Sequence, residues 1–271
     1  MRSMQLQVTD SALSHQDRRQ AVKAVLRAWL PLSEAVLAMA AECMPSPEAA
    51  ASRRMDRLLP RDIVSSIARE LPAEAAGDLG ALASALASSS AAEDAHLVVY
   101  VSKMVSVPAA VVPRRPGEPG PSGPHEERFL AFGRVYSGVV REGMTVQVLS
   151  AKYDPRRPED TSHRQQCTVT GLYLMMGRLL ERVVECPAGN VVALGGLDQA
   201  ILKSATLSST TACPPFAQLQ FQAAPIVRVA IEPALPQEMP RLVEGLRLLN
   251  RADPFVEASA RTPGPPVPAC N

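Results

Sequence analysis

The chain has 271 residues, of which 46% are hydrophobic and 20% are charged, and its formal net charge is +1. This length is sufficient for two ordinary domains, and the composition is that of a soluble globular protein. Because the net charge is near zero, overall charge gives no reason to expect a nucleic-acid or membrane partner. A local basic patch is still compatible with this net charge.

Five cysteines are scattered along the chain, and no two of them form a C-x-x-C pair. This odd set excludes a disulfide framework and a zinc ribbon. His163 and Cys167 lie four positions apart, which suits two metal ligands, but the sequence has no matching second pair, so we predict no metal site. Isolated thiols are usual in a reducing compartment, and we therefore predict a cytoplasmic protein.

No run of about 18 consecutive apolar residues, the length that a bilayer-spanning helix requires, occurs in the sequence. The opening MRSMQLQVTDSALSHQDRRQ also lacks the apolar centre of a signal peptide. We therefore expect no membrane partner.

Helical spacing dominates residues 1–70. Val22, Leu26 and Trp29 recur at the period of a helix that Pro31 ends, and further helices are expected after it. The next segment, 71–94, is rich in alanine and serine and shows no clear amphipathic face. It is predicted to be a poorly ordered connector with some helical tendency.

Strand patterns begin near residue 95. Residues 107–127 hold six prolines, so they are predicted to form a surface insertion between strands. RFLAFGRVYSGVV then alternates, with Val135 on one face and Arg134 and Tyr136 on the other. REG at 141–143 is a predicted turn, and MTVQVLS is expected to return as the partner strand of a hairpin.

Short strands and turns continue to residue 215. The segment LLERVVECPAGNVVALGGL contains a predicted turn at Pro187–Asn190. Strands and turns at such spacing are typical of a closed or nearly closed antiparallel barrel, which we place at 95–215. Met175 and Met176 are expected to fill its core.

The pattern changes again near residue 216. LQFQAAPIVRVAIEP predicts a strand, and an apolar stripe predicts a helix over 237–251. One strand and one helix cannot cover each other's apolar faces. We therefore interpret 216–256 as the start of an incomplete ferredoxin-like domain and 257–271 as a disordered Pro-rich tail. The predicted fold class is multi-domain α and β.

Several segments carry a family resemblance. FGRVYSGVVREGMTVQVL resembles the hairpin of domain II in translational GTPases, and LYLMMGR, CPAGNVVALGGLDQAILKSATL and PIVRVAIEP follow in the order of the elongation factor 2 type. WLPLSEAVLAMAAECMPSPEAA resembles the end of the GTPase domain. That segment and the Pro-rich insertion are most similar to the ribosome-biogenesis branch, the elongation factor-like GTPases. By this resemblance, 1–70 is the end of a GTPase domain, 95–215 is domain II, and 216–256 is the start of domain III.

The resemblance implies a role in cytoplasmic ribosome maturation. The biogenesis member binds GTP with Mg²⁺ and, with the Shwachman–Diamond syndrome protein, releases the anti-association factor from the pre-60S subunit. The implied partners are therefore the 60S subunit and that protein, with ribosomal RNA in contact with the barrel.

The chain itself lacks the GTPase motifs. It has no Gly-Lys pair for a P-loop, no D-x-x-G switch motif and no N-K-x-D guanine motif. We expect no catalytic, nucleotide-binding or metal-binding residue in it, no cofactor of its own, and no GTP hydrolysis by it alone. The chain is interpreted as a fragment, a short isoform or an incomplete gene model.

Arg134 and Lys203 lie in family-like segments and are candidate contacts to ribosomal RNA or to the GTPase domain. The alternative is that both are solvated barrel residues. The glycine-rich segment 185–207 has no lysine after its glycines and no following helix, so it is predicted to form a turn and a strand and not a phosphate site. Residues with expected structural roles in the family pattern are Gly133, Ser137, Gly138, Gly143, Gly189, Asn190, Gly195 and Gly196.

Three other functions stay open. A fragment of the elongation factor 2 translocase is one, and the Pro-rich insertion argues against it. A non-enzymatic module that binds the ribosome or another partner is the second. An unrelated RNA-binding barrel is the third, and an aromatic content of 4% argues against its stacking surface.

Overall fold

The protein forms two compact units, one ending at Ser46 and the other beginning at Pro47, and each is described by itself. The computed structural model describes residues 6–114, 126–177, 179–216 and 229–253, with the single residues 117, 123, 227, 256 and 258. Most of the strand predicted in LQFQAAPIVRVAIEP and of the predicted tail lies outside these residues.

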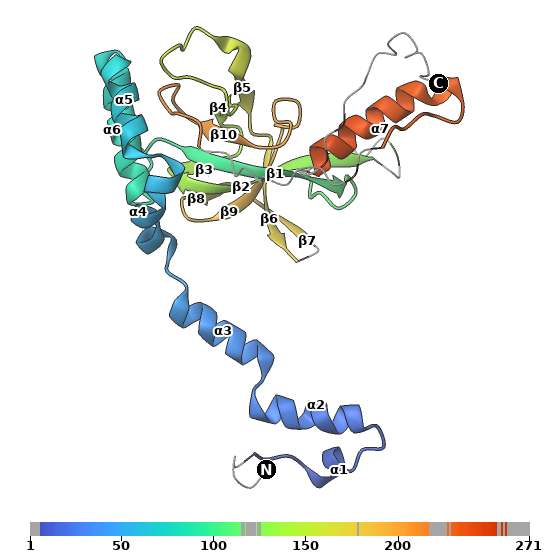
Figure 1. Cartoon of the computed structure of the whole chain (residues 1–271). Helices are drawn as coiled ribbons and strands as arrows, with labels where there is room; N and C mark the ends of the chain where they lie inside the picture. Colours follow the sequence, from blue (N-terminus) through green and yellow to red (C-terminus); the bar gives the residue numbers. More distant parts are fainter. Residues whose placement is uncertain are drawn as a thin grey trace, which may run out of the picture. The chain divides into compact units, whose positions relative to one another are not determined.

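The first unit is helical, as expected. Its helices are α1 (Asp10–Leu13), α2 (Arg18–Trp29) and α3 (Leu32–Cys43) (Figure 1). The Asp17 carboxylate accepts a hydrogen bond from the Arg19 N–H at 2.9 Å and caps the start of α2. Pro31 separates α2 from α3, because proline cannot continue the hydrogen-bond ladder of a helix. None of the three helices contains a buried residue.

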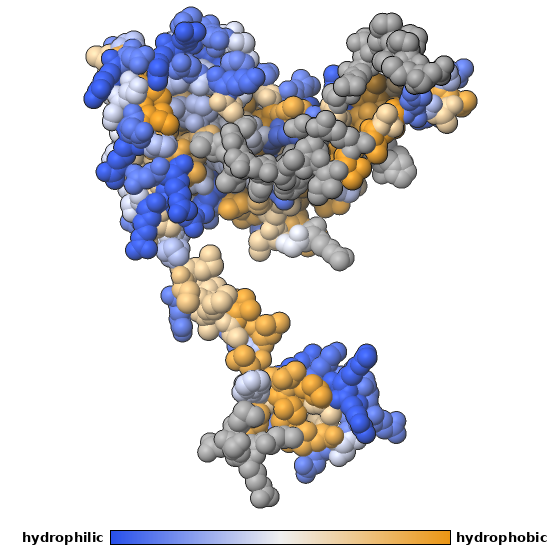
Figure 2. Space-filling view, in the orientation of Figure 1, coloured by the Kyte–Doolittle hydropathy of each residue, from blue (hydrophilic) through white to orange (hydrophobic). Residues whose placement is uncertain are grey.

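The stretch 18–43 is strongly apolar, although charged residues interrupt it. It contains an 18-residue window with a mean hydropathy of 1.4, and none of that window is buried. By length and composition alone this stretch is sufficient to cross a membrane. Figure 2 shows apolar side chains exposed on this unit. The sequence RRQAVKAVLRAW of α2 nevertheless carries four basic residues, and the expected absence of a membrane partner stays a prediction.

The second unit begins with three helices, α4 (Pro47–Leu58), α5 (Arg61–Glu70) and α6 (Ala73–Ala87). The prediction of a poorly ordered connector over 71–94 is wrong for α6, which is a regular helix. Leu79, Leu82 and Leu86 lie on one of its faces and are buried. Most other positions of this helix are small alanine, serine and glycine residues, so its hydrophobic periodicity is weak although its leucines pack in a core.

An eight-stranded antiparallel sheet follows, in the order β5-β4-β10-β1-β2-β9-β6-β7 (Figure 1). A separate two-stranded sheet pairs β3 with β8. The strands are β1 (Val98–Pro108), β2 (Glu127–Ser137), β3 (Val139–Arg141), β4 (Thr145–Leu149), β5 (Arg164–Thr168), β6 (Gly171–Met176), β7 (Leu179–Val183), β8 (Glu185–Pro187), β9 (Val191–Gly195) and β10 (Ala205–Ser208). We call these two sheets the barrel.

The main core of the barrel lies between its strands. Val99, Val135 and Leu194 belong to one buried cluster, although they come from three strands, so the long sheet curls around shared apolar contacts. Val140 of β3 and Cys186 of β8 join the same cluster, which means that the small sheet covers part of this core. The antiparallel barrel predicted from the strand spacing is therefore confirmed.

The opposite face of β1 builds a second core with the helices. Val98 and Tyr100 alternate with the residues of the main core and meet Leu82 and Leu86 of α6. Phe216 completes this cluster, with its ring 5.3 Å from that of Tyr136 in an edge-to-face arrangement. Alternation along one strand thus supplies both faces that the barrel and its helices need.

The hairpin predicted between RFLAFGRVYSGVV and MTVQVLS is wrong. β2 pairs with β1 and β9, whereas β4 pairs with β5 and β10. Gly138 has a φ of +73°, and this left-handed residue turns the chain out of β2 into the short strand β3. The expected turn at 141–143 exists, but it leads across the barrel to a different part of the sheet.

Two further expectations in the barrel need correction. Met175 and Met176 are not core residues: they are 39% and 61% exposed at the end of the β6–β7 hairpin. The Pro-rich insertion does connect β1 and β2, but two residues near its start, Ala109 and Val112, are buried, and Val112 packs with Leu130 and Tyr173. Val112 therefore returns part of this insertion to the barrel surface, while its neighbour Val111 is exposed.

The C-terminal part contains the predicted amphipathic helix. A short 3-10 turn, η3 (Pro236–Glu238), leads into α7 (Met239–Ala252), where Pro240 occupies the first turn. No residue of α7 is buried, and the described residues 229–233 contain no strand. The Arg251 guanidinium lies 5.5 Å from the centre of the Phe129 ring of β2. The incomplete ferredoxin-like domain stays a prediction.

Candidate functional site

The glycines of the family pattern fix the path of the barrel chain. At Gly138 an added Cβ would lie 2.9 Å from the Cα of Leu97, so any side chain would collide with backbone. The Gly138 N–H donates to the Ser90 carbonyl at 2.8 Å, and the buried Ser137 hydroxyl donates to the His96 carbonyl at 2.7 Å. These contacts hold the end of β2 against the segment that precedes β1.

The turn at Pro187–Asn190 is confirmed and brings two distant segments together. The Asn190 side-chain amide donates to the Pro187 carbonyl at 3.1 Å, and Gly189 has a φ of +89°. An added Cβ at Gly189 would lie 2.9 Å from the Cβ of Pro47, the first residue of α4. The turn and the start of α4 are thus in close contact, and only glycine fits between them without displacement.

The other glycines of the pattern have comparable structural positions. The space beside Gly133 is closed by the Tyr100 carbonyl, and that beside Gly196 by the Thr168 carbonyl. Gly195 packs against the Thr170 hydroxyl. The Gly143 N–H donates to the Val169 carbonyl at 2.8 Å. None of these glycines is part of a phosphate-binding turn at the start of a helix.

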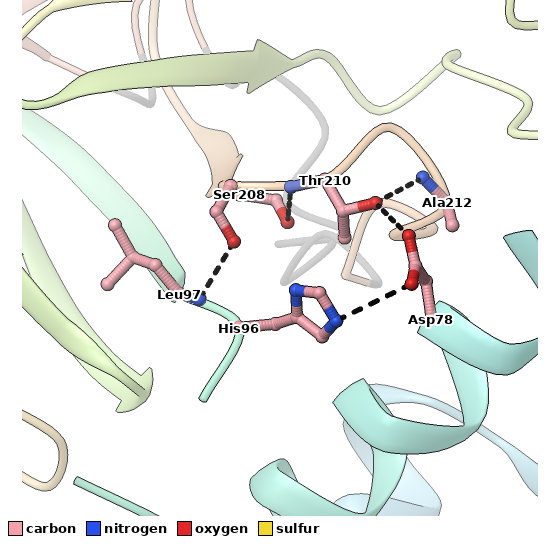
Figure 3. A network of polar contacts seen from close by, with 7 residues as sticks. Asp78, His96, Leu97, Ser208, Thr210 and Ala212 are labelled. Carbon is pink, nitrogen blue, oxygen red and sulfur yellow. Dashed lines mark hydrogen bonds and ion pairs between the residues drawn. The ribbon is translucent and has the colours of Figure 1, made fainter. Parts of the chain in front are cut away.

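A polar network attaches α6 to the barrel (Figure 3). The Thr210 hydroxyl donates to the Asp78 carboxylate of α6 at 3.4 Å and accepts from the Ala212 N–H at 3.2 Å. His96 Nε2 lies 3.9 Å from the other oxygen of Asp78. The network lies beside the leucine contacts of α6, and the two together determine where the α4–α6 layer lies on the barrel.

Arg134 extends from β2 toward this layer. Its guanidinium donates to the Gly189 carbonyl at 3.5 Å and lies 5.8 Å from the centre of the Tyr136 ring. Strand alternation places Arg134 and Tyr136 on the same face of β2, opposite the core residue Val135. The sequence predicted this shared face correctly.

A shallow groove runs between α4 and β2, and we call it the α4–β2 groove. Its polar side chains are Arg54, Ser89, Arg134 and Tyr136, and its apolar wall includes Met55 and Leu58. No carboxylate lines it. Burial raises the pKa of the Tyr136 hydroxyl, against the opposing effect of Arg134 and Arg54, so this hydroxyl stays protonated at neutral pH.

Lys203, the second predicted contact residue, lies in different surroundings. It belongs to the loop between β9 and β10, and its ammonium donates to the Val256 carbonyl at 2.8 Å. The structure thus connects Lys203 to the segment that follows α7, while Arg134 lines the α4–β2 groove.

Thiol and metal chemistry have little support among the described residues. Cys213 is buried, and burial raises the pKa of its thiol to about 12, while burial also raises the pKa of Cys186. Such thiols are poor nucleophiles because the thiolate is the reactive form. Across the described part of the chain, no three histidine, cysteine or acidic side chains come together as a metal site.

The α4–β2 groove therefore presents two guanidiniums and a neutral hydroxyl, which suit the binding of an anion and not a chemical reaction. The sequence pattern identified Arg134 and placed Tyr136 on the same face of its strand, but it did not indicate Arg54 as a neighbour. Arg54 belongs to a helix that the resemblance assigned to the end of the GTPase domain, which was one of the two contacts expected for Arg134, but no single residue of that helix was indicated.

Comparison with known proteins agrees with the fold. The family described as Elongation factor Tu domain 2 matches residues 128–208. Human Elongation factor-like GTPase 1 is 34% identical, over 94% of this chain and 29% of its own length. Ribosome assembly protein 1 of Schizosaccharomyces pombe is 31% identical, over 100% of this chain and 30% of its own length.

The chain thus spans about three tenths of the length of these relatives. The alignment with the human protein covers 333 positions, more than this chain contains, so the human protein has residues within it that have no counterpart here. The matched region includes the helices before the barrel as well as the barrel itself.

Proposed function

Because this chain belongs to the elongation factor-like GTPase family, we propose that its barrel binds the large ribosomal subunit during ribosome assembly. One observation carries the proposal: the similarity to Elongation factor-like GTPase 1 extends over 94% of the chain and is not limited to the widespread barrel domain. The fission yeast relative is named for ribosome assembly, which supports the same function.

In its finer form, the proposal places the chain in cytoplasmic maturation of the 60S subunit. There it would act beside the Shwachman–Diamond syndrome protein in the release of the anti-association factor. The α4–β2 groove supports a contact with ribosomal RNA, because it combines two arginines with a neutral tyrosine hydroxyl. Basic side chains of this kind position a protein on a phosphate backbone without reading its sequence.

GTP and Mg²⁺, which the family implies, do not fit a site made from these residues. The sequence has no Gly-Lys pair, so it supplies neither the lysine nor the backbone cradle that hold the β- and γ-phosphates. We therefore derive no nucleotide step for this chain. Titration with a fluorescent guanine nucleotide should show no saturable binding, and binding in the micromolar range would contradict this part of the proposal.

Sedimentation tests the ribosomal part. The chain should co-sediment with purified 60S subunits at about 50 mM salt and lose much of that binding at about 200 mM, because phosphate contacts release counterions. Purified 40S subunits serve as the matched control and should retain less of the chain. Absence of the chain from the 60S pellet at low salt would contradict the proposal.

A further inference from the structure

Arg54 and Arg134 come from elements that are far apart in the sequence and meet at the α4–β2 groove. Arg54 is exposed on α4, and Arg134 is half-buried on β2. Arg54, Arg134 and Tyr136 all line this groove, so the three polar groups lie on one surface. The fold thereby concentrates positive charge at one place on a chain whose formal net charge is only +1.

Neither arginine has an acidic partner among the described residues. Other arginines of the same unit do: Arg61 pairs with Asp56 at 3.0 Å, and Arg141 pairs with Glu93 at 2.8 Å. Asp56, the acidic residue nearest to Arg54 along α4, is thus occupied by an arginine outside the groove. Within the part of the chain that the structure describes, the one polar contact of the Arg134 guanidinium is the neutral Gly189 carbonyl.

The groove is also fixed in shape. Gly189 packs against Pro47 at the start of α4, and Met55 and Leu58 of the same helix contact the core that contains Leu86 of α6. The ring of Tyr136 packs edge to face against that of Phe216. The two guanidiniums therefore extend from packed elements. Because the backbone of the groove is already ordered, binding of an ion has a smaller entropic cost.

We propose that the α4–β2 groove binds a backbone phosphate of RNA between Arg54 and Arg134, with the Tyr136 hydroxyl as a further donor. A guanidinium donates two parallel hydrogen bonds to phosphate oxygens, and two unpaired guanidiniums at one groove match the charge and the geometry of a phosphodiester. This inference rests on the proposed function, because it names the ribosomal component that the barrel contacts.

The test measures binding of the whole chain to a fluorescein-labelled single-stranded oligouridylate over a range of salt concentrations. Each phosphate contact contributes about 0.7 to the slope of log K against log salt for a single strand. Because the two arginines share one phosphate, removing both in the double variant Arg54→Gln/Arg134→Gln should lower the magnitude of this slope by about 0.7, and each single variant should lower it by part of that amount.

Arg53→Gln is the matched control, because Arg53 is the exposed neighbour of Arg54 on α4 and does not line the groove. It removes the same charge and should leave the slope within error of the parent chain. Arg134→Lys is a second control, since it keeps the charge and should preserve most of the slope. Arg54 is exposed, so the Arg54→Gln variant stays informative even where Arg134→Gln affects folding.

Two outcomes overturn the inference: a slope for Arg54→Gln equal to that for Arg53→Gln, or no oligouridylate binding by the parent chain at low salt. Its failure is distinguishable from failure of the proposed function. If the parent chain and both glutamine variants co-sediment equally with 60S subunits, the groove inference fails and the function stands. If the parent chain binds oligouridylate through Arg54 but does not co-sediment, the function fails and the groove stands.

Discussion

In the second unit, a single strand, β1, buries Val98, Val99 and Val101 completely, whereas no residue of α1, α2 or α3 in the first unit is buried. The first unit is not less apolar: Leu32 and Leu37 of α3 are 78% and 69% exposed. The difference lies in what the apolar residues contact. β1 packs in the barrel core on one face and against helices on the other, while the described residues of the first unit leave these leucines of α3 exposed.

This contrast shows that hydrophobic content alone does not build a core. Long-range pairing brings the strands of the barrel together, and their alternation then supplies two apolar faces. An isolated helix of about 12 residues has no equivalent source of stability, since most helical stability in proteins comes from packing. The following predictions test whether the two units differ in this way.

The largest expected difference concerns the thiols. Cys213 is fully buried in the second unit, and Cys43 is exposed on α3. Under native conditions iodoacetamide should modify Cys43 on the order of 10³-fold faster than Cys213, because Cys213 reacts only after unfolding. Peptide mass spectrometry over time measures both rates in one sample. Equal rates would show that the core between β1 and the helices, which contains Cys213, is accessible to the reagent.

The thiol of Cys213 also makes stability depend on pH. Burial raises its pKa to about 12 in the folded chain, compared with about 8.5 for a free cysteine, so the folded state holds a proton that the unfolded state releases. Stability should therefore fall as pH rises from about 8.5 toward 12. The Cys213→Ala variant should show a smaller loss over this range in urea titrations. An identical pH dependence of stability in the variant and the parent chain would show that Cys213 does not cause it.

Truncation of leucines compares the helices of the two units directly. Leu82→Ala in α6 removes a fully buried side chain and should lower the free energy of unfolding by about 2–5 kcal/mol. Leu37→Ala in α3 removes a side chain of the same size from an exposed position and should change it by less than about 0.5 kcal/mol. Urea unfolding followed by circular dichroism measures both. A small effect of Leu82→Ala would contradict the packing of α6 and would indicate a loosely ordered connector.

Two glycines separate the cost of backbone strain from the cost of collision. Gly138 and Gly143 both have positive φ, but an added Cβ contacts backbone only at Gly138. Gly143→Ala should cost about 1–2 kcal/mol, the penalty of a left-handed residue, and Gly138→Ala should cost more. Thermal unfolding of the two variants measures the difference. Equal costs would mean that the segment before β1 moves away without penalty.

The smallest effect is expected at the polar network. Thr210→Val keeps the shape of the side chain and removes the hydroxyl that joins Asp78 to the Ala212 N–H. The variant should lose about 0.5–1.5 kcal/mol, the usual net value of a hydrogen bond. The opening free energy of the α6 amides, measured by hydrogen exchange, should fall by a similar amount. An unchanged exchange rate would show that the leucines alone hold α6.

The local parts of this structure were predictable, and the long-range parts were not. Alternation placed Arg134 opposite Val135, and Pro187–Asn190 has the expected turn, because both features depend on neighbours in the sequence. The predicted partner strand of MTVQVLS was wrong, because strand pairing depends on contacts between distant residues. Gly138, with its left-handed conformation, directs the chain out of β2 before it can form the predicted hairpin. The α4–β2 groove combines residues 80 positions apart along the chain. Only the folded arrangement shows that Arg54 and Arg134 meet.

Hydrogen exchange of the whole chain with and without 60S subunits tests the central claim most directly, because it shows which unit contacts the ribosome. We predict that peptides from α4 and from residues 131–137 of β2 exchange more slowly in the presence of 60S subunits, while peptides from α2 and α3 change little. The contradicting result is an unchanged exchange rate in α4 and β2, or slowing that is confined to α2 and α3.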